Sequence, residues 1–557
     1  MQSILVPKLV SVFQEGYGLS RLRADAIAGL TVAIVALPLS MAIAIASGVT
    51  PDRGLYTAIV GGFLVSLLGG SRHQIGGPAG AFIVLVAATV SRHGVDGLVL
   101  ATAMAGLMLM AAGFLRLGTY IKFIPYPVTV GFTAGIAVII FASQISELLG
   151  LRLPGKEPGP IVDKLSALAG AYQTVNPAAV AIATLTIGTI LILRRLRPTW
   201  PGLLIAVGLA SVAAAVLALP VDTIGTRFGG IPRGLPVPAL PRFSLDLASA
   251  VLPDAISFAL LGAIESLLSA VVADGMTGRR HRSNMELVAQ GVANIGSALF
   301  GGICVTGTIA RTATNVRAGA VSPVSGMLHA GFLLLFMVIA APLASYIPLA
   351  ALAGVLAVVA WNMVERPAFA ALMRSSGGDT VVLLVTFLLV IFRDLTEGIV
   401  VGFVLGALLF IDRMGKSVTV TPHSQTDEEA DAQADEDRER PVDNTDSDTV
   451  IYRIGGAFFF GAAATVGSVL DRIADQYRNF VLDCSSVSFM DSTAANVIEG
   501  TIRKAEKAGV AVYIAGAGPD LRRLLEAHDV VAPRVSYVAD IAAARADIRR
   551  RRLDETG

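Results

Sequence analysis

An arginine within an apolar, membrane-type sequence is the first residue whose type and position suggest chemistry. Arg311 lies in residues 301–325 (GGICVTGTIARTATNVRAGAVSPVS), a stretch too short and too polar to cross a bilayer alone. An arginine at membrane depth costs about 2.5 to 3.5 kcal/mol on insertion scales, so it normally faces a cavity or a counter-ion. The glycines, an extended piece and a short helix over residues 307–316 would place Arg311 in the first turns of that helix. Because a half-helix N-terminus offers unpaired N–H groups and a positive dipole end, we expect an anion site; an arginine that reaches a lipid headgroup is the alternative.

A carboxylate in another apolar span is the second candidate. Glu265 lies in the middle of residues 258–270 (FALLGAIESLLSA), where an acidic side chain indicates a functional site. Such a group can carry a proton or help to bind a cation such as sodium, and Ser266 and Ser269 offer neighbouring hydroxyl oxygens. A structural ion pair between Glu265 and Arg311 is the alternative, and the two roles are compatible.

A second interrupted stretch, residues 67–88 (LLGGSRHQIGGPAGAFIVLVAA), has the same layout as the first. The separation between its glycine pair at Gly70 and the pair at Gly302 nearly equals the separation between the Asp-Ala-Ile sequences at Asp25 and Asp254. Two short, glycine-interrupted segments at matching places predict a transporter site built from inverted repeats. Chance similarity between apolar segments is the alternative.

The predicted anion site lies where the two half-helices begin. Pro38 removes a backbone hydrogen bond within the first span and would let Ser40 line a cavity, although a simple helix kink explains this proline equally well. Small residues around Pro78 permit close approach of the backbone to a ligand or to another helix. The predicted substrate-binding residues are Ser40, Gly77, Pro78, Ala79, Gly80, Ala81, Phe82, Thr308, Ile309, Ala310 and Arg311, and the predicted coupling residues are Glu265 and Ser269.

The composition is that of a membrane protein. Of 557 residues, 54% are hydrophobic and 15% are charged, and the mean hydropathy is +0.70. The net charge of +1 gives no indication of nucleic-acid binding. Cys304 and Cys484 are too few for a disulfide framework or a thiolate metal site, and no Walker motif, metal-ligand cluster or Ser/His/Asp triad is present. We therefore expect a protein that is not an enzyme and has no cofactor; its N-terminus does not resemble a signal peptide.

The hydrophobic pattern predicts fourteen spans, seven in each half. Twelve are long enough for most of a bilayer core of about 30 Å, and two are half-spans. Ser283 and Glu286 fit a capping box at the start of one span. The expected full spans are residues 25–47, 53–69, 96–116, 126–149, 178–195, 202–219, 253–274, 285–300, 322–346, 348–363, 378–393 and 396–413, and the half-spans are residues 78–90 and 307–316.

The placement of Lys and Arg favours cytoplasmic termini. Fourteen spans put both termini on one side, and the connections assigned to that side carry basic runs at residues 194–197 and 279–282. Arg413 and Lys416 follow the last span on the same side, whereas the opposite side has weaker basic groups. We expect a multi-pass protein of the plasma (bacterial inner) membrane with its N- and C-termini in the cytoplasm.

The composition changes abruptly after the last span. Residues 427–448 contain eleven acidic residues and cannot bury a core, so we expect a disordered linker. The alternation of strands and helices that follows predicts a small layered α/β domain. The expected parts are an N-terminal cytoplasmic segment, a transmembrane domain, an acidic linker and the α/β domain, at residues 1–24, 25–416, 417–448 and 449–557 respectively.

Hydroxyl residues begin one helix of the predicted α/β domain. Ser492 and Thr493 follow a buried strand directly after Asp491, and all three are good N-cap residues. The same hydroxyls could be a phosphorylation or binding point. Strands are expected at residues 451–454, 457–460, 480–483 and 510–514, and helices at residues 462–477, 494–508, 519–527 and 541–551.

Nearly the whole chain resembles the SulP anion transporters, with a C-terminal part similar to the STAS domain. The motifs that carry the resemblance are GLTVA from Gly29, GGPAGA from Gly76, GVANI from Gly291, TIARTATN from Thr308, and LDCS…FMDST from Leu482. The resemblance implies seven-plus-seven inverted repeats divided into core and gate domains, often in dimers. It also implies that the third and tenth spans aim their half-helix N-termini at the anion.

Within that family the chain looks like the branch that holds a bacterial C4-dicarboxylate transporter and a sodium-dependent bicarbonate transporter. In the bicarbonate relative an Asp stands at Glu265 and helps to bind sodium, and no arginine matches Arg311, so the pattern here is nearer the dicarboxylate relative. Leu39 and Ser40 stand where many members have Gln or Glu, and Ala310 stands where serine is common. In STAS relatives the phosphorylated hydroxyl matches Thr493.

The leading hypothesis is secondary active uptake of a small anion, such as a dicarboxylate, sulfate or bicarbonate, by proton symport and alternating access. The expected partners are the anion, a proton or sodium ion, the lipid bilayer and a second copy of the chain. Sodium-coupled bicarbonate uptake and an uncoupled exchanger or channel are the main alternatives. A nucleobase transporter on a similar repeat fold is a third possibility, against which Arg311 and the STAS-like domain argue.

Overall fold

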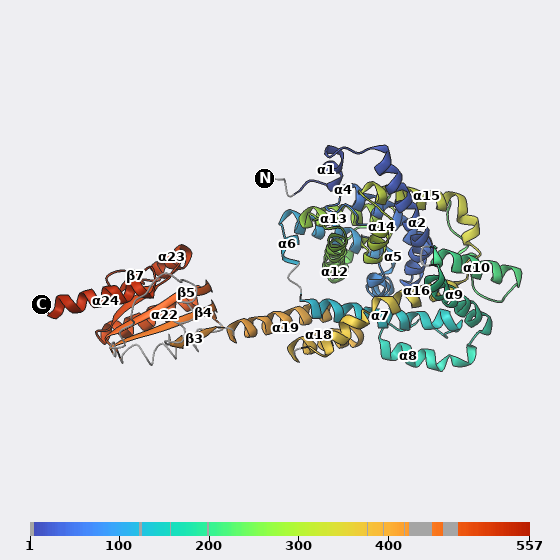
Figure 1. Cartoon of the computed structure of the whole chain (residues 1–557). Coiled ribbons are helices and arrows are strands. Elements are labelled where there is room, and N and C mark those ends of the chain that lie inside the picture. Colours follow the sequence, from blue (N-terminus) through green and yellow to red (C-terminus); the bar gives the residue numbers. More distant parts are fainter. Residues whose placement is uncertain are drawn as a thin grey trace. The chain divides into compact units, whose positions relative to one another are not determined.

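The chain folds into two compact units. The computed structural model describes residues 5–121, 125–155, 157–197, 200–375, 377–393, 395–416, 418–422, 448–460 and 477–556. Contacts within the chain divide it into Met1–Val404 and Leu405–Gly557. The first unit is built of helices, and the second contains a five-stranded sheet (Figure 1).

Long apolar helices form most of the first unit. Eight helical stretches of the described chain are long and apolar enough to cross a membrane. These are α2 (Leu19–Ala46), η2 with α5 (Gly80–Phe82, Ile83–Phe114), α7 (Tyr126–Leu149), α9 (Pro177–Leu196), α12 (Leu245–Thr277), α15 (Val324–Ala344), α16 with α17 (Leu349–Met363, Arg366–Met373) and α19 (Leu395–Lys416).

Shorter helices supply the remaining spans and the connections. The spans are α3, η1 and α4 in one run (Pro51–Tyr56, Thr57–Gly61, Gly62–Leu68), α10 (Gly202–Val216), α13 (Ser283–Leu299), α14 (Ile309–Arg317) and α18 (Gly377–Phe392). The connections hold α1 (Lys8–Gln14), α6 (Gly118–Ile121), α8 (Ile161–Gly170), η3 (Tyr172–Thr174) and α11 (Ile224–Phe228). With α5 counted as two spans, the described chain has the fourteen predicted spans.

A single glycine divides α5 into a half-span and a full span. Gly94 has φ 68° and ψ −171°, a conformation that an L side chain rarely adopts, and the helix resumes directly after it. The half-span therefore ends a few residues after the predicted end at residue 90. The kink confirms that the GGPAGA stretch begins a half-helix and not a complete crossing.

Helix α12 begins well before the start predicted at residue 253. Ser244 is the N-cap residue, and its hydroxyl accepts a hydrogen bond from the backbone N–H of Leu247 at 3.1 Å. Pro253, the first residue of the predicted span, lies inside the helix. The connections of the first unit also contain α8 and α11, for which the apolar pattern gave no signal.

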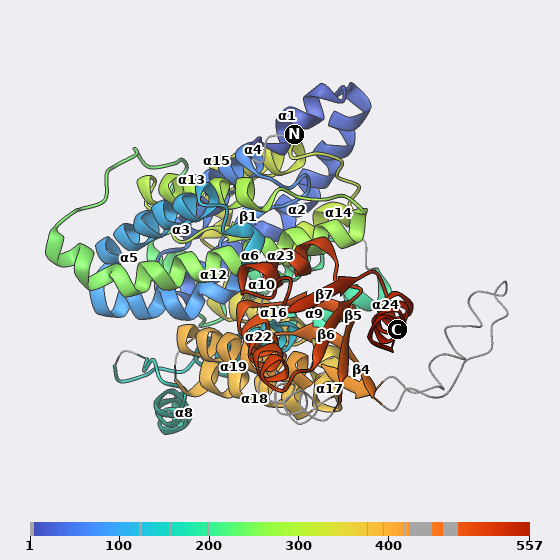
Figure 2. The same ribbon diagram turned by 90° about the vertical axis from the view of Figure 1, so that its left-hand side faces the viewer.

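Elements of the two halves interleave in the core of the first unit. Helix α5 of the first half packs against α12 and α13 of the second half (Figure 2). Reciprocally, α2 of the first half packs against α14 and α15 of the second. At the centre, β1 (Gly76–Gly77) pairs antiparallel with β2 (Thr306–Gly307), so the two interrupted segments meet.

The second unit has helices on both faces of one sheet. The strand order is β3-β4-β5-β6-β7, in which β4 to β7 are parallel and β3 is antiparallel to β4. Helices α22 and α23 share one apolar core with the sheet, and α24 shares a core on its other face. The strands are Thr419–Pro422, Thr449–Phe458, Asn479–Met490, Ala511–Ala515 and Val535–Val538, and the helices are Ser492–Lys507, Pro519–Ala527 and Ile541–Thr556.

Three features of the second unit differ from the sequence prediction. The strands expected at residues 451–454 and 457–460 form the single strand β4, and β7 gave no signal in the sequence. Strand β3 lies within the predicted linker, because the alternating TVTP segment extends the sheet at its edge. Most of the helix expected at residues 462–477 and of the acidic linker lies outside the described residues.

Candidate functional site

The short β1–β2 ladder places the starts of the two half-helices together. Gly76 pairs with Gly307, and Gly77 pairs with Thr306. The chain leaves β1 through Ala79 into η2 and α5, and it leaves β2 through Thr308 into α14. Because the strands are antiparallel, the two half-helices run away from the ladder in opposite directions with their N-termini facing the same central region.

Backbone donors are exposed at both of these N-termini. Within the described chain, the N–H groups of Gly80 and Ala81 in η2 and of Ile309, Ala310 and Arg311 in α14 have no backbone or side-chain acceptor. Five free donors at two facing helix starts, each at the positive end of its helix dipole, form an arrangement suited to an anion.

Some of the predicted substrate-binding residues have structural contacts of their own. The backbone N–H and the hydroxyl of Thr308 both donate to the carbonyl oxygen of Ile75, at 3.0 and 3.2 Å. The Phe82 N–H donates to Ala79, and its buried ring packs edge-on against Phe258 with centroids 6.0 Å apart. Thr308 and Phe82 therefore shape the site, and their backbone donors are already engaged.

Arg311 is almost completely buried and only partly hydrogen-bonded. The residue is 2% exposed, and Nη2 donates to Ser40 Oγ at 3.2 Å and to the Pro78 carbonyl at 3.3 Å. Nε and Nη1 have no partner among the described residues. A Cβ added at Gly77 would collide with Nη1, so a side chain at this position would displace the guanidinium. The guanidinium thus joins both half-helices and keeps two donors free.

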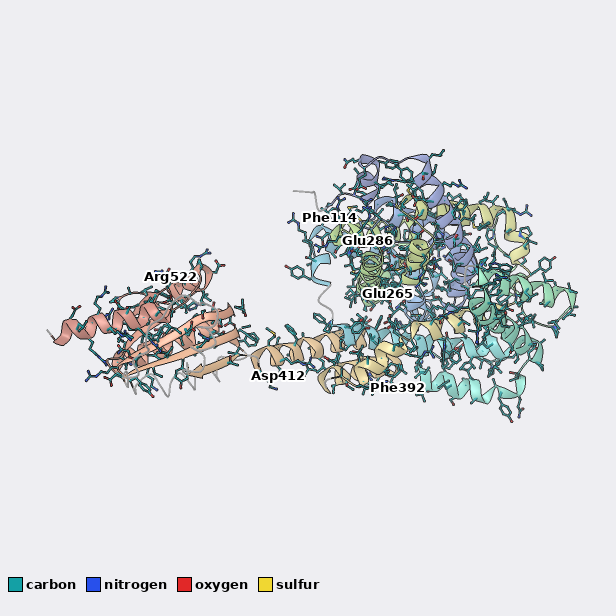
Figure 3. All side chains as sticks on the ribbon, viewed as in Figure 1. Phe114, Glu265, Glu286, Phe392, Asp412 and Arg522 are labelled. Carbon is teal, nitrogen blue, oxygen red and sulfur yellow. The ribbon has the colours of Figure 1, made fainter. Side chains whose placement is uncertain are left out.

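Glu265 lies on α12 at 7% exposure, deep within the first unit (Figure 3). In the described part of the chain it forms no ion pair with Arg311 and no hydrogen bond with another residue. The structural Glu265–Arg311 pair that the sequence left open is therefore not formed in this structure. A buried carboxyl without a partner is costly, which fits a group that is neutralised by a proton or cation.

The two serines beside Glu265 are fixed by their own hydrogen bonds. Ser269 Oγ donates to Thr312 Oγ1 at 3.0 Å, and Thr312 in turn accepts from the Ile75 N–H at 3.1 Å. Ser266 Oγ accepts from Gln74 Nε2 at 3.0 Å. These contacts fasten the Glu265 segment of α12 to the start of α14 and to the segment before β1.

Glu286 is a second buried carboxylate whose role the sequence did not indicate. The predicted capping box is wrong, because Arg282 is the N-cap residue of α13 and Glu286 points across to the other half. Its oxygens accept from the N–H groups of Gly70 and Ser71 at 2.8 and 3.1 Å, and from Gln74 and Gln290 at 2.9 and 3.0 Å. The carboxylate is completely buried and saturated, so it anchors the segment leading to β1 (Figure 3).

Two aspartates at matching places hold the far ends of the half-helices. Asp25 of α2 accepts from the N–H groups of Val321 and Ser322, at 2.8 and 3.1 Å, just after α14. Asp254 of α12 accepts from Thr89 at 3.0 Å and from Arg92 at 2.5 Å, at the end of the half-span in α5. Arg92 and Val321 are separated in sequence by the same interval as the two aspartates, so equivalent contacts occur in both repeats.

The second unit presents its candidate phosphorylation residues to the surface. Ser492 and Thr493 are exposed in the first turn of α22, and Asp491 caps that helix by accepting from Ala494 N–H at 2.9 Å. In the strand before it, burial raises the pKa of Asp483, but hydrogen bonds from the Ser485 N–H and from Arg453 outweigh it and hold the pKa below its ordinary value.

Comparisons with known proteins agree with this architecture. The profile of the sulfate permease family matches residues 22–386, and that of the STAS domain matches residues 440–532. The chain is 40% identical over 514 residues to the "Putative sulfate transporter YvdB" of Bacillus subtilis, covering 92% of this chain and 94% of that one. It is 33% identical over 515 residues to the "Bicarbonate transporter BicA" of Synechocystis, covering 91% and 90%.

A solved structure has the same fold. The murine Slc26a9 anion transporter in the inward-facing state superposes with a TM-score of 0.84 at 18% identity, covering 98% of this chain and 94% of that one. The family profile covers well over half of the chain, and the fourteen spans with their inverted repeat and the C-terminal domain fit these relatives. The chain therefore belongs to the sulfate permease family of membrane anion transporters and carries a STAS domain.

Proposed function

We propose that this protein takes up a small anion by proton symport, and that the anion binds between the half-helix N-termini at Arg311. The observation that supports the proposal most strongly is the free Nε and Nη1 of a buried arginine beside five free backbone donors. A buried cation with unused donors leaves a place for a negative partner. Both half-helices would contribute, so closure around the anion would depend on both repeats.

The donor set fits planar carboxylates and oxyanions. A guanidinium offers two parallel N–H bonds to such groups, and backbone N–H groups add donors of fixed direction. Candidate substrates are dicarboxylates, sulfate and bicarbonate; two relatives are named as a putative sulfate transporter and a bicarbonate transporter. Ser40, which accepts from Nη2 of Arg311, is also close enough to the guanidinium to contact an anion there.

Glu265 is the proposed proton carrier. Its carboxyl is buried and has no partner in the described chain, so the charged form depends on a cation or a neighbouring dipole. An anion bound at Arg311 would offset the guanidinium charge and would make a proton on Glu265 more favourable. Proton and anion binding would then support each other, as linkage requires.

Sodium coupling is the second candidate for the driving ion. Glu265 and Ser269 could supply oxygen ligands, and one relative of this chain is a bicarbonate transporter. The Ser269 hydroxyl already donates to Thr312, so a sodium site there would have to share that oxygen. An uncoupled exchanger, in which Glu265 has no transport role, is the third candidate.

The proposed cycle is alternating access in the plasma membrane. A core that contains both half-helices would move relative to a gate, and the termini would lie in the cytoplasm. The protein would act as a homodimer, with a transmembrane domain at residues 25–416, an acidic linker at residues 417–448 and a cytoplasmic STAS domain after it. Phosphorylation of Ser492 or Thr493 would regulate transport through charge added at the α22 N-terminus.

A proteoliposome uptake screen tests this proposal. Purified full-length protein is assayed with radiolabelled succinate, sulfate and bicarbonate, each with and without an inward pH gradient or sodium gradient. We expect accumulation of at least one anion that is driven by the pH gradient and abolished by a protonophore. Uptake that follows only the sodium gradient would replace the proton with sodium, and absence of uptake of all three anions would refute the substrate class.

A further inference from the structure

Several buried polar atoms behind Arg311 have no hydrogen-bond partner among the described residues. They are Ser66 Oγ, Asn315 Oδ1 and both ring nitrogens of His73 and of His329. His329 and Asn315 are completely buried, and Ser66 and His73 are at most 5% exposed. An unpaired buried polar atom costs about 1 to 3 kcal/mol, so such groups are normally satisfied by internal water.

Hydrogen bonds and close approaches bring these four residues to one place. Asn315 Nδ2 donates to the His73 carbonyl and to Ser325 Oγ, each at 2.9 Å. Ser66 Oγ points at Gly326, the residue after Ser325, where an added Cβ would collide with it. His329 lies one helical turn after Ser325 on α15, and its ring is within electrostatic reach of the Arg311 guanidinium.

A chain of hydrogen bonds continues from Asn315 toward the surface. Ser325 Oγ donates to the Ser322 carbonyl at 3.0 Å, and Ser322 Oγ donates to Asp25 at 2.5 Å. Asp25 also accepts from the hydroxyl of Tyr17 at 2.8 Å, and Tyr17 is only partly buried, before the start of α2. The hydrogen-bonded groups therefore extend from the partly buried Tyr17 to Asn315 and the His73 carbonyl, and the ring nitrogens of the two histidines lie beyond them without a partner among the described residues.

The charges around the two histidines differ. Arg311 from α14 is the charged group that acts on His329. The charged groups that act on His73 are Asp25 of α2 and, more weakly, Arg279, Arg72 and Asp274. Helix α4 contributes Ser66 and no charged side chain to this place within the described residues. With Arg311 unoccupied, a positive charge on His329 would therefore be repelled by one neighbouring cation.

We propose that His329 is a proton-carrying residue of the transport cycle and that internal water beside Ser66, His73 and Asn315 connects it to the Tyr17 end of the passage. The inference rests on the proposed anion uptake. An anion on Arg311 offsets the guanidinium charge, so a neutral His329 ring nitrogen can accept a proton from a hydronium ion, forming an N–H bond and leaving a water molecule. When the anion leaves, that bond breaks and the proton passes to water in the passage, which is the cytoplasmic side in the predicted topology.

The test compares His329→Gln with His528→Gln, the same substitution at a histidine of the second unit. Both full-length variants are measured in proteoliposomes for pH-driven accumulation between pH 5.5 and 8 and for counterflow exchange. For His329→Gln we expect at least a tenfold loss of pH-driven accumulation, a flat pH profile and counterflow within twofold of wild type. His528→Gln should match wild type in both assays. A wild-type pH profile in His329→Gln overturns the inference.

A second variant tests the passage itself without removing the ring. Ser325→Ala breaks the contact with Asn315 and should slow proton-driven uptake more than counterflow, with a larger slowing in D₂O. Equal slowing of both assays, with no change in the solvent isotope effect, contradicts the passage. Failure of the proposed function would give a different result, because wild-type protein would then bind none of the tested anions. Failure of this inference alone would leave wild-type uptake intact.

Discussion

The two repeats of the transmembrane unit share the arrangement of their helices but not their charged residues. The interval that relates Asp25 to Asp254 also relates Ser40 to Ser269. Each aspartate accepts hydrogen bonds from the end of the half-helix of the opposite repeat, whereas Ser40 and Ser269 both contact α14, through Arg311 and Thr312 respectively. The same interval matches Arg311 with Phe82. Both half-helices begin at the β1–β2 ladder and offer free N–H groups, yet one carries a buried guanidinium and the other a buried ring.

The difference distinguishes the residues that hold the helices in place from the residues that supply charge. Residues that recur in both repeats fasten helix ends and determine where the half-helices lie. Residues found once, Arg311 and Glu265, supply charge, and the first repeat has Phe82 and Ala36 at the corresponding positions. Backbone donors of both repeats would then contact the anion, whereas its charge would be compensated by the second repeat alone. Each prediction below alters one side of this comparison.

Arg311→Ala should have the largest effect. Loss of two charge-assisted hydrogen bonds, each worth about 1.5 to 3 kcal/mol, predicts a fall in kcat/KM for uptake of at least about 100-fold. Arg311→Lys should also be poor, because an ammonium does not reproduce the guanidinium fork. The counterpart variant Phe82→Leu should change uptake by less than about tenfold. An unchanged KM and an unchanged rate of uptake in Arg311→Ala proteoliposomes would show that the charge of the second repeat is not needed for the anion.

Glu265→Gln should separate driven uptake from exchange. The amide mimics the protonated carboxyl, so we expect substrate binding in a thermal-shift assay and counterflow near the wild-type rate. Accumulation driven by a pH gradient should fall by at least about tenfold. Ala36→Ser, at the corresponding position of the first repeat, serves as the control. Proton-driven accumulation at the wild-type level in Glu265→Gln eliminates Glu265 as the carrier.

Asp25→Asn and Asp254→Asn should lower stability in parallel. Each substitution weakens charge-assisted hydrogen bonds to the far end of a half-helix, for a cost of about 1 to 3 kcal/mol. The apparent Tm in detergent should fall by a few degrees for both. Asp25→Asn should lose more, because Asp25 also accepts from Tyr17 and Ser322 Oγ. A large loss at one position and none at the other would show that the matched contacts are not equivalent.

Removal of the chain after Lys416, which contains the STAS domain, should have the smallest effect on binding. A chain that ends after Lys416, before β3, should still insert and bind the anion with a Kd within about threefold of the full-length value. Ending it there avoids leaving β3 without its partner strand β4. Rate and abundance are expected to fall modestly. Loss of binding in a monodisperse truncated protein would show that the STAS domain contributes to the site.

The sequence predicted the fold well because its signals are local. Apolar runs set the spans, and glycine pairs with an isolated Arg311 marked the interruptions. The start of α12 was predicted too late: the apolar span was expected from residue 253, whereas Ser244 caps a helix that already includes Pro253. Strand β3 was missed because a short edge strand is identified by its partner and not by its own pattern.

The candidate site was predicted only in part, because its polar network is long-range. Glu286 and Gly70 lie in different halves of the first unit, and no spacing rule joins them. The same holds for Asn315 and His73, which link α14 to the segment before β1. The repeat did point to Asp25 and Asp254, but not to the helix ends that they hold. Patterns in a single sequence identify charged residues within apolar spans, but the hydrogen-bond partners of these residues are known only from the folded structure.

Equilibrium binding to wild-type protein and Arg311→Ala tests the central claim most directly. Purified full-length proteins are titrated by calorimetry with the anion selected in the uptake screen, at neutral pH and low chloride. We predict one saturable site in the wild type, a Kd weakened at least about 100-fold in Arg311→Ala, and a Kd within threefold of wild type in the control Ala36→Ser. An unchanged Kd in a folded Arg311→Ala protein would place the anion elsewhere and contradict the account.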